Sequence, residues 1–532
     1  MVTLTFLSEP RFTDLISEQL AAALWTETGE LTVLVRFERE TGGDCRKADL
    51  PLNGEFHMPP QIHRTAAGFH ILILGVGPEP PSPAGIASLV SQLRLHFHHI
   101  LLAAPVDKDS APWLAECVHR SSLTYLLTSA KMGESQFVHP LLRRVRSRSG
   151  PQPPRVKLIG CAGREEESQD FDQLTQTVAL PVHLFIHDCP GLAGASASAS
   201  ETALSGLFRA DVRRLAREIC GRWVGLALSS GAAKGFAHVG VIQVLEENGI
   251  EVDIVAGSSM GAYVGSLWAY GSDGAELERI AREMEARWSL LSLVDPAFPP
   301  RQGFLRGFAV KKRLMRTIGH VRFAELARPL RVVAGNLATL ERVVFSAGEV
   351  APAVHASCAV PGVCVPVTID GETYIDGGIV DPLPVDVLRE MGVARVIAVD
   401  VIPTLERIRA GLGTAREPKR SSPSGVRQLF RRLLPVNQQL NYFARGNILE
   451  ILMRSLYGAQ IRVAQASSRL ADLVLRPDIG DDRWLDYRNP RKFIALGRAA
   501  AERRLEEIKA LVAGKELNHA QQPASETLAA TA

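Results

Sequence analysis

The first 190 residues alternate two kinds of apolar pattern. Short uninterrupted apolar runs have the length of buried strands, and between them apolar residues recur at the spacing of one helix face. Strands that alternate with helices in this way are typical of a parallel α/β layer. The predicted strands are 31–37, 69–74, 100–105, 123–127, 156–159 and 183–186, and the predicted helices include 12–25, 84–97 and 111–120.

A small-residue segment then interrupts this alternation. Residues 190–206 are rich in Gly, Ala and Ser, a composition typical of linkers. A basic amphipathic helix is predicted after it, over 207–220. Strands are then predicted at 223–228 and 254–256, each leading to a helix, at 236–245 and 262–268.

Residues 405–432 differ in composition from what precedes them. Arginine and lysine outnumber glutamate there, and residues 426–434 place apolar side chains at helical spacing beside arginines. Such a segment is suited to an anionic membrane surface, and equally to a solvated linker with a helix packed on the domain. An apolar helix predicted at 447–453 either lines an acyl pocket or closes the core, and a charged helix over 489–513 caps the fold.

A chain of 532 residues is too long for one ordinary core. We expect an α/β domain of unassigned role, with regulation or docking as the default, before a second α/β domain of three layers with a parallel-rich central sheet. The predicted parts are 1–190 for the first domain, 191–221 for the linker and lead-in helix, 222–404 for the second domain, 405–432 for the basic linker, 433–513 for a C-terminal helical part and 514–532 for a disordered tail.

Composition narrows the class of protein. The apolar share of 46% with 22% charged residues is that of a globular chain, and a net charge of +3 gives no reason to expect a nucleic-acid partner. Seven cysteines without C-x-x-C spacing indicate reduced thiols and an intracellular protein. Neither a secretory signal nor an apolar run of about 18 residues is present. We therefore expect a cytoplasmic protein, with peripheral contact at the inner face of the membrane.

One short segment has the G-x-S-x-G form of a nucleophile elbow. It is Gly257-Ser258-Ser259-Met260-Gly261, and it stands between a predicted strand and a predicted helix. A tight strand–turn–helix elbow exposes the central serine, and glycines flank it because side chains there would collide. The start of the helix also directs partial positive charge toward a developing anion. Ser259 is therefore the candidate nucleophile.

A glycine-containing loop, Ser230-Gly231-Ala232-Ala233-Lys234-Gly235, precedes the elbow. It joins a strand to a helix, an arrangement that aims successive backbone N–H groups at one point and suits an oxyanion. The rival interpretation is a nucleotide phosphate loop, but Lys234 is followed by Gly235 and not by the Ser or Thr that holds magnesium. The Gly75-Val76-Gly77 sequence lacks the rest of a dinucleotide fingerprint, so a plain turn is favoured there.

A carboxylate stands in a second motif, Asp376-Gly377-Gly378, after an apolar strand-like stretch. Asp376 is the candidate base for Ser259. No cluster of His, Cys and acidic residues has metal-ligand spacing, so we expect neither a metal nor a cofactor.

These residues carry a family resemblance. The run LALSSGAAKGFAHVGV followed by GSSMG resembles the core of the patatin-like phospholipases, most closely the bacterial branch related to the neuropathy target esterase catalytic domain. The stretches Ala356-Ser357-Cys358-Ala359-Val360-Pro361-Gly362 and Tyr374-Ile375-Asp376-Gly377-Gly378 resemble the same family. The resemblance extends over residues 222–400 and more weakly to about 510.

The resemblance implies a Ser259–Asp376 dyad without a histidine. In that family the aspartate accepts the serine proton and then activates the deacylating water. Gly231, Ala232 and Ala233 correspond to the oxyanion donors, and Lys234 stands at the family's Arg or Lys. The family has three or four consecutive glycines where this chain has Ser229-Ser230-Gly231-Ala232-Ala233, and a methyl at Ala232 disfavours backbone angles that glycine adopts easily.

Three further residues have less direct roles. His238 has a counterpart in the family that is not the base, so we expect packing or hydrogen bonding there. His355 is a weaker candidate for chemistry, and Asp381 is expected to order the loop after Asp376.

The resulting hypothesis is a calcium-independent serine lipid acyl hydrolase, a phospholipase or lysophospholipase that passes through an acyl-enzyme. The alternatives are a weakly active scaffold or regulatory binding protein and a nucleotide-dependent regulator. An acyltransferase would use the same acyl-enzyme and differ only in the acceptor.

Overall fold

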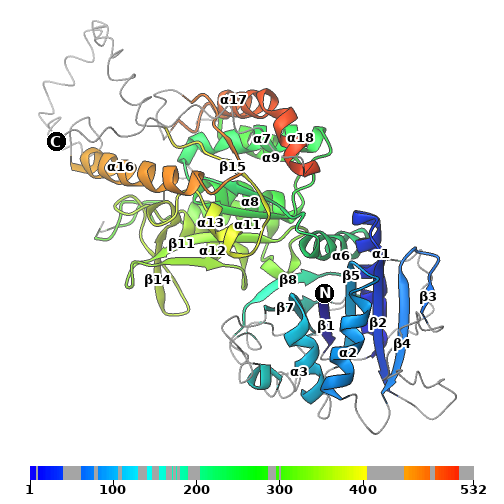
Figure 1. Cartoon of the computed structure of the whole chain (residues 1–532). Helices are drawn as coiled ribbons and strands as arrows, with labels where there is room; N and C mark the ends of the chain where they lie inside the picture. The colour runs from blue at the N-terminus through cyan, green and yellow to red at the C-terminus, as the bar shows by residue number, and fades with distance from the viewer. Residues whose placement is uncertain are drawn as a thin grey trace, which may run out of the picture. The chain divides into compact units, whose positions relative to one another are not determined.

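The computed structural model describes residues 1–6, 10–39, 62–76, 82–105, 111–129, 141–145, 155–162, 171, 175, 180–189, 204–285, 295–298, 301–403, 448–479 and 486–514. The chain divides into two compact units (Figure 1). The first comprises Met1–Trp223, Val321–Pro329 and Ser346–Glu349, and the second comprises Val224–His320, Leu330–Phe345 and Val350–Ala532.

The first unit is built on one largely parallel sheet. Its strand order is β3-β4-β2-β5-β1-β6-β7-β8, and every neighbouring pair is parallel except β3–β4. The strands are β1 (Val2–Phe6), β2 (Thr32–Arg39), β3 (His63–Arg64), β4 (His70–Val76), β5 (His99–Pro105), β6 (Leu123–Thr128), β7 (Val156–Cys161) and β8 (Val182–Ile186). All six predicted strands are confirmed, whereas β1 and β3 were not predicted.

The predicted helices of this unit are also confirmed. They are α1 (Pro10–Thr28), α2 (Pro83–Leu93), α3 (Ala111–Arg120) and the lead-in helix α6 (Gly206–Ile219). The second helix ends earlier than expected because residues 94–97 leave the helix in hydrogen-bonded turns.

The second unit contains a mixed sheet that is parallel at its centre. Its order is β13-β14-β11-β10-β9-β15-β16, with β12 also paired to β11. The run from β11 to β16 is parallel, and β12, β13 and β14 are antiparallel to their neighbours. The strands are β9 (Val224–Leu228), β10 (Ile254–Ser258), β11 (Leu330–Asn336), β12 (Arg342–Phe345), β13 (Val367–Ile369), β14 (Glu372–Asp376), β15 (Arg395–Val399) and β16 (Leu473–Leu475). The expected α/β class with parallel-rich sheets is confirmed.

Helices cover the second sheet. The helices α7, α9 and α17 pack on one another, while α8 contacts β10 and β11 and is itself contacted by α11 and α12 (Figure 1). Their bounds, with those of the other α-helices described in this unit, are α7 (Ala237–Glu247), α8 (Met260–Tyr270), α9 (Gly274–Arg282), α11 (Phe308–Ile318), α12 (Val350–Ser357), α13 (Val385–Glu390), α16 (Ile448–Ser468), α17 (Pro490–Arg503) and α18 (Leu505–Ala513).

The prediction of a single helix over 489–513 is wrong in one respect, because the segment forms two helices. Arg504, with φ −115°, separates α17 from α18. Its guanidinium donates to the Val474 carbonyl at 3.1 Å and pairs with Glu507, so tertiary contacts fix the break.

Several predictions fall outside the described residues. These are residues 190–203 of the linker, the basic segment 405–432, the amphipathic stretch 426–434 and the tail 515–532. Within the described ranges, none of the helices has the length and hydropathy needed to cross a membrane.

A buried ionic network joins α6 to the first sheet. The carboxylate of Glu218 accepts hydrogen bonds from the Tyr125 hydroxyl at 2.6 Å, from His183 Nε2 at 2.9 Å and from the Lys157 ammonium. Burial alone would raise the pKa of Glu218, but the charges and hydrogen bonds of His183 and Lys157 outweigh it and lower that pKa to about 2. The ionised carboxylate is therefore stabilised in the folded state.

We expect Glu218→Gln to lower the free energy of unfolding by about 3–5 kcal/mol at neutral pH, because it leaves buried cations without their counter-charge. The folded pKa lies below the unfolded value of 4.5, so this stabilisation is present above about pH 4.5 and is lost as pH falls toward 2. Urea unfolding at several pH values measures it. Glu18→Gln is the control, since its pair with Arg36 is half-exposed and contributes below about 1 kcal/mol. Equal losses in the two variants would contradict the assignment.

Candidate active site

The predicted elbow is a sharp turn between β10 and α8, with Ser259 at its centre. Ser259 has φ 53° and ψ −119°, a backbone conformation that costs a serine about 1–3 kcal/mol. Its N–H donates to Ser357 Oγ at 2.8 Å, and its carbonyl accepts from the Tyr263 N–H at 3.0 Å. Hydrogen bonds on both sides of the residue therefore hold the strained serine in place.

Two glycines are required by close backbone approach. A Cβ at Gly261 would lie 2.2 Å from the Leu228 carbonyl oxygen, and a Cβ at Gly377 would lie 2.2 Å from the Val333 carbonyl oxygen. Neither contact can be relieved without moving a strand. The elbow is thus pressed against the end of β9, and the Asp-Gly-Gly turn is pressed against β11.

Strand register brings Ser259 and Asp376 together across 117 residues of sequence. On one side of β11, Ser258 of β10 pairs with Val333, and on the other side Asp376 of β14 pairs with Ala334. The residue after β10 and the last residue of β14 therefore meet beside β11. Ser259 Oγ donates to Asp376 Oδ2 at 2.7 Å.

The environment of Asp376 favours proton exchange near neutrality. Its side chain is 2% exposed, and its second oxygen, Oδ1, accepts from the Gly378 N–H at 2.7 Å. Burial raises the pKa of Asp376 to about 6, against the opposing effect of its hydrogen bonds to Ser259 and Gly378. At pH 7 the carboxyl is ionised, yet it is a stronger base than an exposed aspartate.

The glycine-containing loop presents unused backbone donors. No group in the described part of the chain accepts from the N–H of Gly231, Ala232 or Ala233. The Lys234 N–H instead closes the turn onto the Gly231 carbonyl at 3.1 Å. The three residues expected to donate to an oxyanion, Gly231, Ala232 and Ala233, therefore each have a free N–H.

Ala232 adopts the conformation that its methyl group disfavours. It has φ 49°, in the left-handed region that glycine enters without penalty, at a cost of about 1 kcal/mol. The departure from a glycine run is therefore accommodated by strain, and the loop keeps its turn.

The loop lies beside both halves of the dyad. The 3₁₀ turn η2 (Ala232–Phe236) contacts α8, the helix that begins after Ser259. A Cβ at Gly378 would lie 3.0 Å from Ser230 Cβ and 2.9 Å from Asp376 Oδ1. Free N–H donors, the serine hydroxyl and the carboxylate therefore border one region.

The other predicted residues lie outside this constellation. His238 Nε2 is 2.9 Å from the Ser229 carbonyl and must donate to it, and burial lowers the pKa of His238 to about 4, so the expected hydrogen-bonding role is found. His355 lines a separate pocket. The Asp381 N–H donates to the Gly377 carbonyl at 2.8 Å, which holds the turn after Asp376.

Sequence reasoning missed three residues close to the dyad. Ser357 is fully buried and binds the Ser259 backbone; its only sequence signal is its position in the family-like stretch around Ala356. Tyr457 and Tyr487 have raised phenol pKa values because of burial and, further, the nearby charge of Asp376. No local pattern marks either tyrosine.

Among the described residues, no group of three or more His, Cys, Asp or Glu side chains is arranged to hold a metal ion.

The central region is similar to known proteins. Residues 226–389 match the family model described as Patatin-like phospholipase. The chain is 30% identical over 304 residues to a protein named lysophospholipase nte1 from Emericella nidulans, covering 57% of this chain and 19% of the relative. A second protein of that name, from Aspergillus fumigatus, is 30% identical over 307 residues, with the same coverage of 57% and 19%. The chain thus spans about a fifth of the length of the curated relatives it matches.

A solved structure, VipD from Legionella pneumophila, is similar with a TM-score of 0.28 and 17% identity, covering 54% of this chain and 67% of that one. A TM-score this low supports no conclusion about this chain.

We expect Ser357→Ala to destabilise the fold by about 1–3 kcal/mol, because the buried Ser259 N–H loses its acceptor. Urea unfolding measures the loss, and labelling of Ser259 by a fluorophosphonate should slow about tenfold as the elbow relaxes. Ser266→Ala is the matched control: this buried hydroxyl only donates to the Tyr263 carbonyl at 2.8 Å. If both variants lose stability equally and label at the wild-type rate, Ser357 has no special role in holding the elbow.

Proposed function

We propose that this chain, whose residues 226–389 form a patatin-like phospholipase domain, is a serine hydrolase of carboxylic esters in glycerophospholipids or lysophospholipids. The observation that carries the proposal is the hydrogen bond of 2.7 Å between Ser259 Oγ and the buried Asp376 carboxylate. The names of the matched relatives support a lysophospholipid substrate. We further propose that the protein reaches its lipid from the cytoplasmic side of the membrane.

In the acylation step, Ser259 Oγ attacks the ester carbonyl carbon while Asp376 accepts the hydroxyl proton. The carbonyl oxygen becomes an oxyanion, which the free N–H groups of Gly231, Ala232 and Ala233 stabilise. The C–O bond to the alcohol then breaks, and the leaving oxygen takes the proton from Asp376. The first product is a lysophospholipid, or a glycerophosphodiester when the substrate is itself a lysophospholipid, and the acyl group stays as an ester on Ser259.

In the deacylation step, Asp376 accepts a proton from water, and the hydroxide attacks the acyl carbonyl. The same backbone donors stabilise the second oxyanion. When the bond to Ser259 Oγ breaks, the serine recovers its proton from Asp376 and the fatty acid leaves. One carboxyl group thus acts as base and acid in both halves of the reaction.

Burial of Asp376 makes a dyad without histidine chemically reasonable. A general base works best with a pKa near the operating pH, and burial moves this carboxyl to about 6. The nearby His238 is neutral and committed to the Ser229 carbonyl, so it does not compete for the role.

The second candidate is a weakly active scaffold or regulatory binding protein. The observation in its favour is the strained Ala232 in the donor loop. Each misplaced oxyanion donor costs about 10²–10³ in rate, so a small displacement of this loop would leave a binding domain with little turnover.

Replacing either member of the dyad should abolish hydrolysis of p-nitrophenyl butyrate and lysophosphatidylcholine in the presence of a chelator. We expect Ser259→Ala and Asp376→Asn to lower kcat by about 10⁴-fold or more. Asp381→Asn, a neighbouring carboxyl outside the dyad, should keep most of the activity.

Fluorophosphonate labelling separates the two candidates. An active hydrolase labels in the wild type and not in Ser259→Ala. An unlabelled, inactive wild type would favour the scaffold, and an active Asp376→Asn variant would remove Asp376 from the mechanism.

The pH dependence follows from the raised pKa of Asp376. Because the base must be ionised, kcat/KM should fall about tenfold for each pH unit below about 6 and be flat above it. The same pKa shift affects stability. The folded state binds the proton of Asp376 more tightly than the unfolded state does, so the protonated carboxyl stabilises the fold. This stabilisation is full below pH 3.8, the unfolded pKa, and is lost as pH rises through about 6. The free energy of unfolding of Asp376→Asn should therefore be roughly 3 kcal/mol higher than that of the wild type at pH 8. A less stable variant would contradict this.

A further inference from the structure

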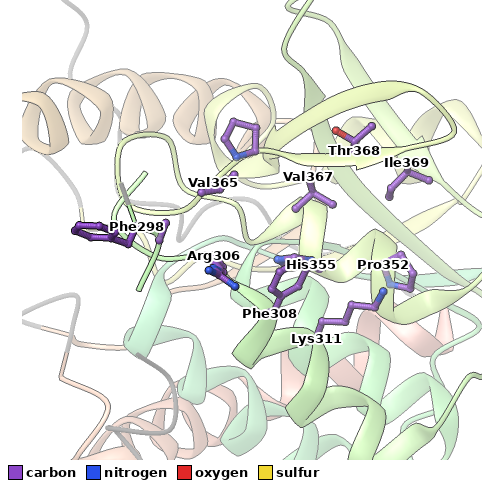
Figure 2. Close-up of a pocket in the computed structure, with 12 residues that line it drawn as sticks. Phe298, Arg306, Phe308, Lys311, Pro352, His355, Val365, Val367, Thr368 and Ile369 are labelled. Carbon is purple, nitrogen blue, oxygen red and sulfur yellow. The ribbon is translucent and has the colours of Figure 1, made fainter. Parts of the chain in front are cut away.

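A pocket separate from the dyad lies in the second unit, between the start of α11, α12 and β13. Its volume is about 480 Å³, and neither Ser259 nor Asp376 lines it. Figure 2 shows its lining, in which basic side chains stand among apolar ones. The lining residues that matter are Phe298, Arg306, Phe308, Lys311, His355 and Val367.

Two cations of this pocket form no ion pair. Within the described ranges, no carboxylate pairs with the Arg306 guanidinium or the Lys311 ammonium. The nearby carboxylate of Asp295 instead accepts from the N–H groups of Gly307 and Ala309 at 3.0 Å each. The two cations outnumber this one carboxylate, so the pocket is suited to an anionic group.

His355 forms the part of the wall between the two cations. It is 4% exposed, and its buried Nε2 lies against the Gly307 backbone, where an added Cβ would be 2.8 Å away. The pKa of His355 is lowered by burial and by the charge of Lys311, which keeps the ring neutral. The ring therefore adds no charge to the pocket, and Figure 2 shows it between Arg306 and Lys311.

Aromatic side chains stand exposed at the edge of the pocket. Phe298 is 90% exposed and Phe308 is 57% exposed, and the Phe308 ring lies 5.5 Å from the His355 ring. Exposed phenylalanines beside basic groups are typical of surfaces that enter the boundary between lipid head groups and acyl chains. A soluble anion would make no use of them.

We propose that this pocket binds the head group of an anionic phospholipid in a membrane surface. Arg306 and Lys311 hold the phosphate oxygens, and Phe298 and Phe308 enter the acyl layer. Phosphatidylglycerol, whose head group carries a negative charge on its phosphate, is the probe lipid. This docking site goes beyond the ester hydrolysis proposed for Ser259 and does not depend on it.

Vesicle binding tests the site without hydrolysis. The full chain carrying Ser259→Ala is floated with phosphatidylcholine vesicles that contain or lack phosphatidylglycerol. We expect phosphatidylglycerol to increase binding, and Arg306→Gln or Lys311→Gln to weaken it about fivefold each, the contribution of one basic side chain at an anionic surface. Phe298→Ser should weaken binding without altering the fold, because this side chain is almost wholly exposed.

Lys312→Gln is the matched control. It removes the same charge from the next residue of α11, which is exposed and does not line the pocket. We expect it to change vesicle binding less than twofold. If Lys312→Gln weakens binding as much as Lys311→Gln does, the attraction is a general surface effect and the proposal is wrong.

Competition by soluble glycerol 3-phosphate distinguishes a lipid head group from a free phosphate. The lipid assignment fails if glycerol 3-phosphate binds the wild type and, in addition, Phe298→Ser leaves vesicle binding unchanged. The pocket would then bind a free phosphate. Loss of Ser259 chemistry affects none of these outcomes.

Discussion

The pairing of β11 is the constraint on which the candidate site depends. This strand has parallel β10 on one side and antiparallel β14 on the other, and each neighbour ends in one half of the Ser259–Asp376 pair. The pairing register of two strands is specified to a single residue, since a slip of one position would turn every side chain of the strand to the opposite face of the sheet. The hydrogen bond of 2.7 Å is therefore set by backbone pairing before any side chain is adjusted.

Chemistry and stability oppose each other at this site. Ser259 occupies a strained backbone conformation, and Asp376 is ionised in a place where burial favours its neutral form. The rest of the domain offsets both costs, through the close backbone packing at Gly261 and Gly377 and through the hydroxyl of Ser357. Such strain is commonly found where a protein holds groups ready for reaction.

Local sequence was sufficient for the features whose pattern is local. The elbow around Ser259 and most strands could be predicted because apolar runs and glycine spacing define them. The strand β1 was missed because five residues at a chain terminus form a strand only by pairing with β5 and β6. Ser357, Tyr457 and the pocket at His355 depend on long-range contacts. Asp376 was a candidate base from its place after a strand-like stretch, and the family resemblance paired it with Ser259. The break at Arg504 likewise arises from a contact with Val474.

The left-handed Ala232 links the donor loop to the packing around it. An alanine returns to the right-handed region unless its neighbours prevent this, because its methyl group is more comfortable there. The contact between η2 and α8 lies beside this residue and helps to hold the loop. If warming loosens the contact, the loop N–H groups lose their alignment while the sheet is still paired. We therefore expect thermal inactivation of the site to precede melting of the fold.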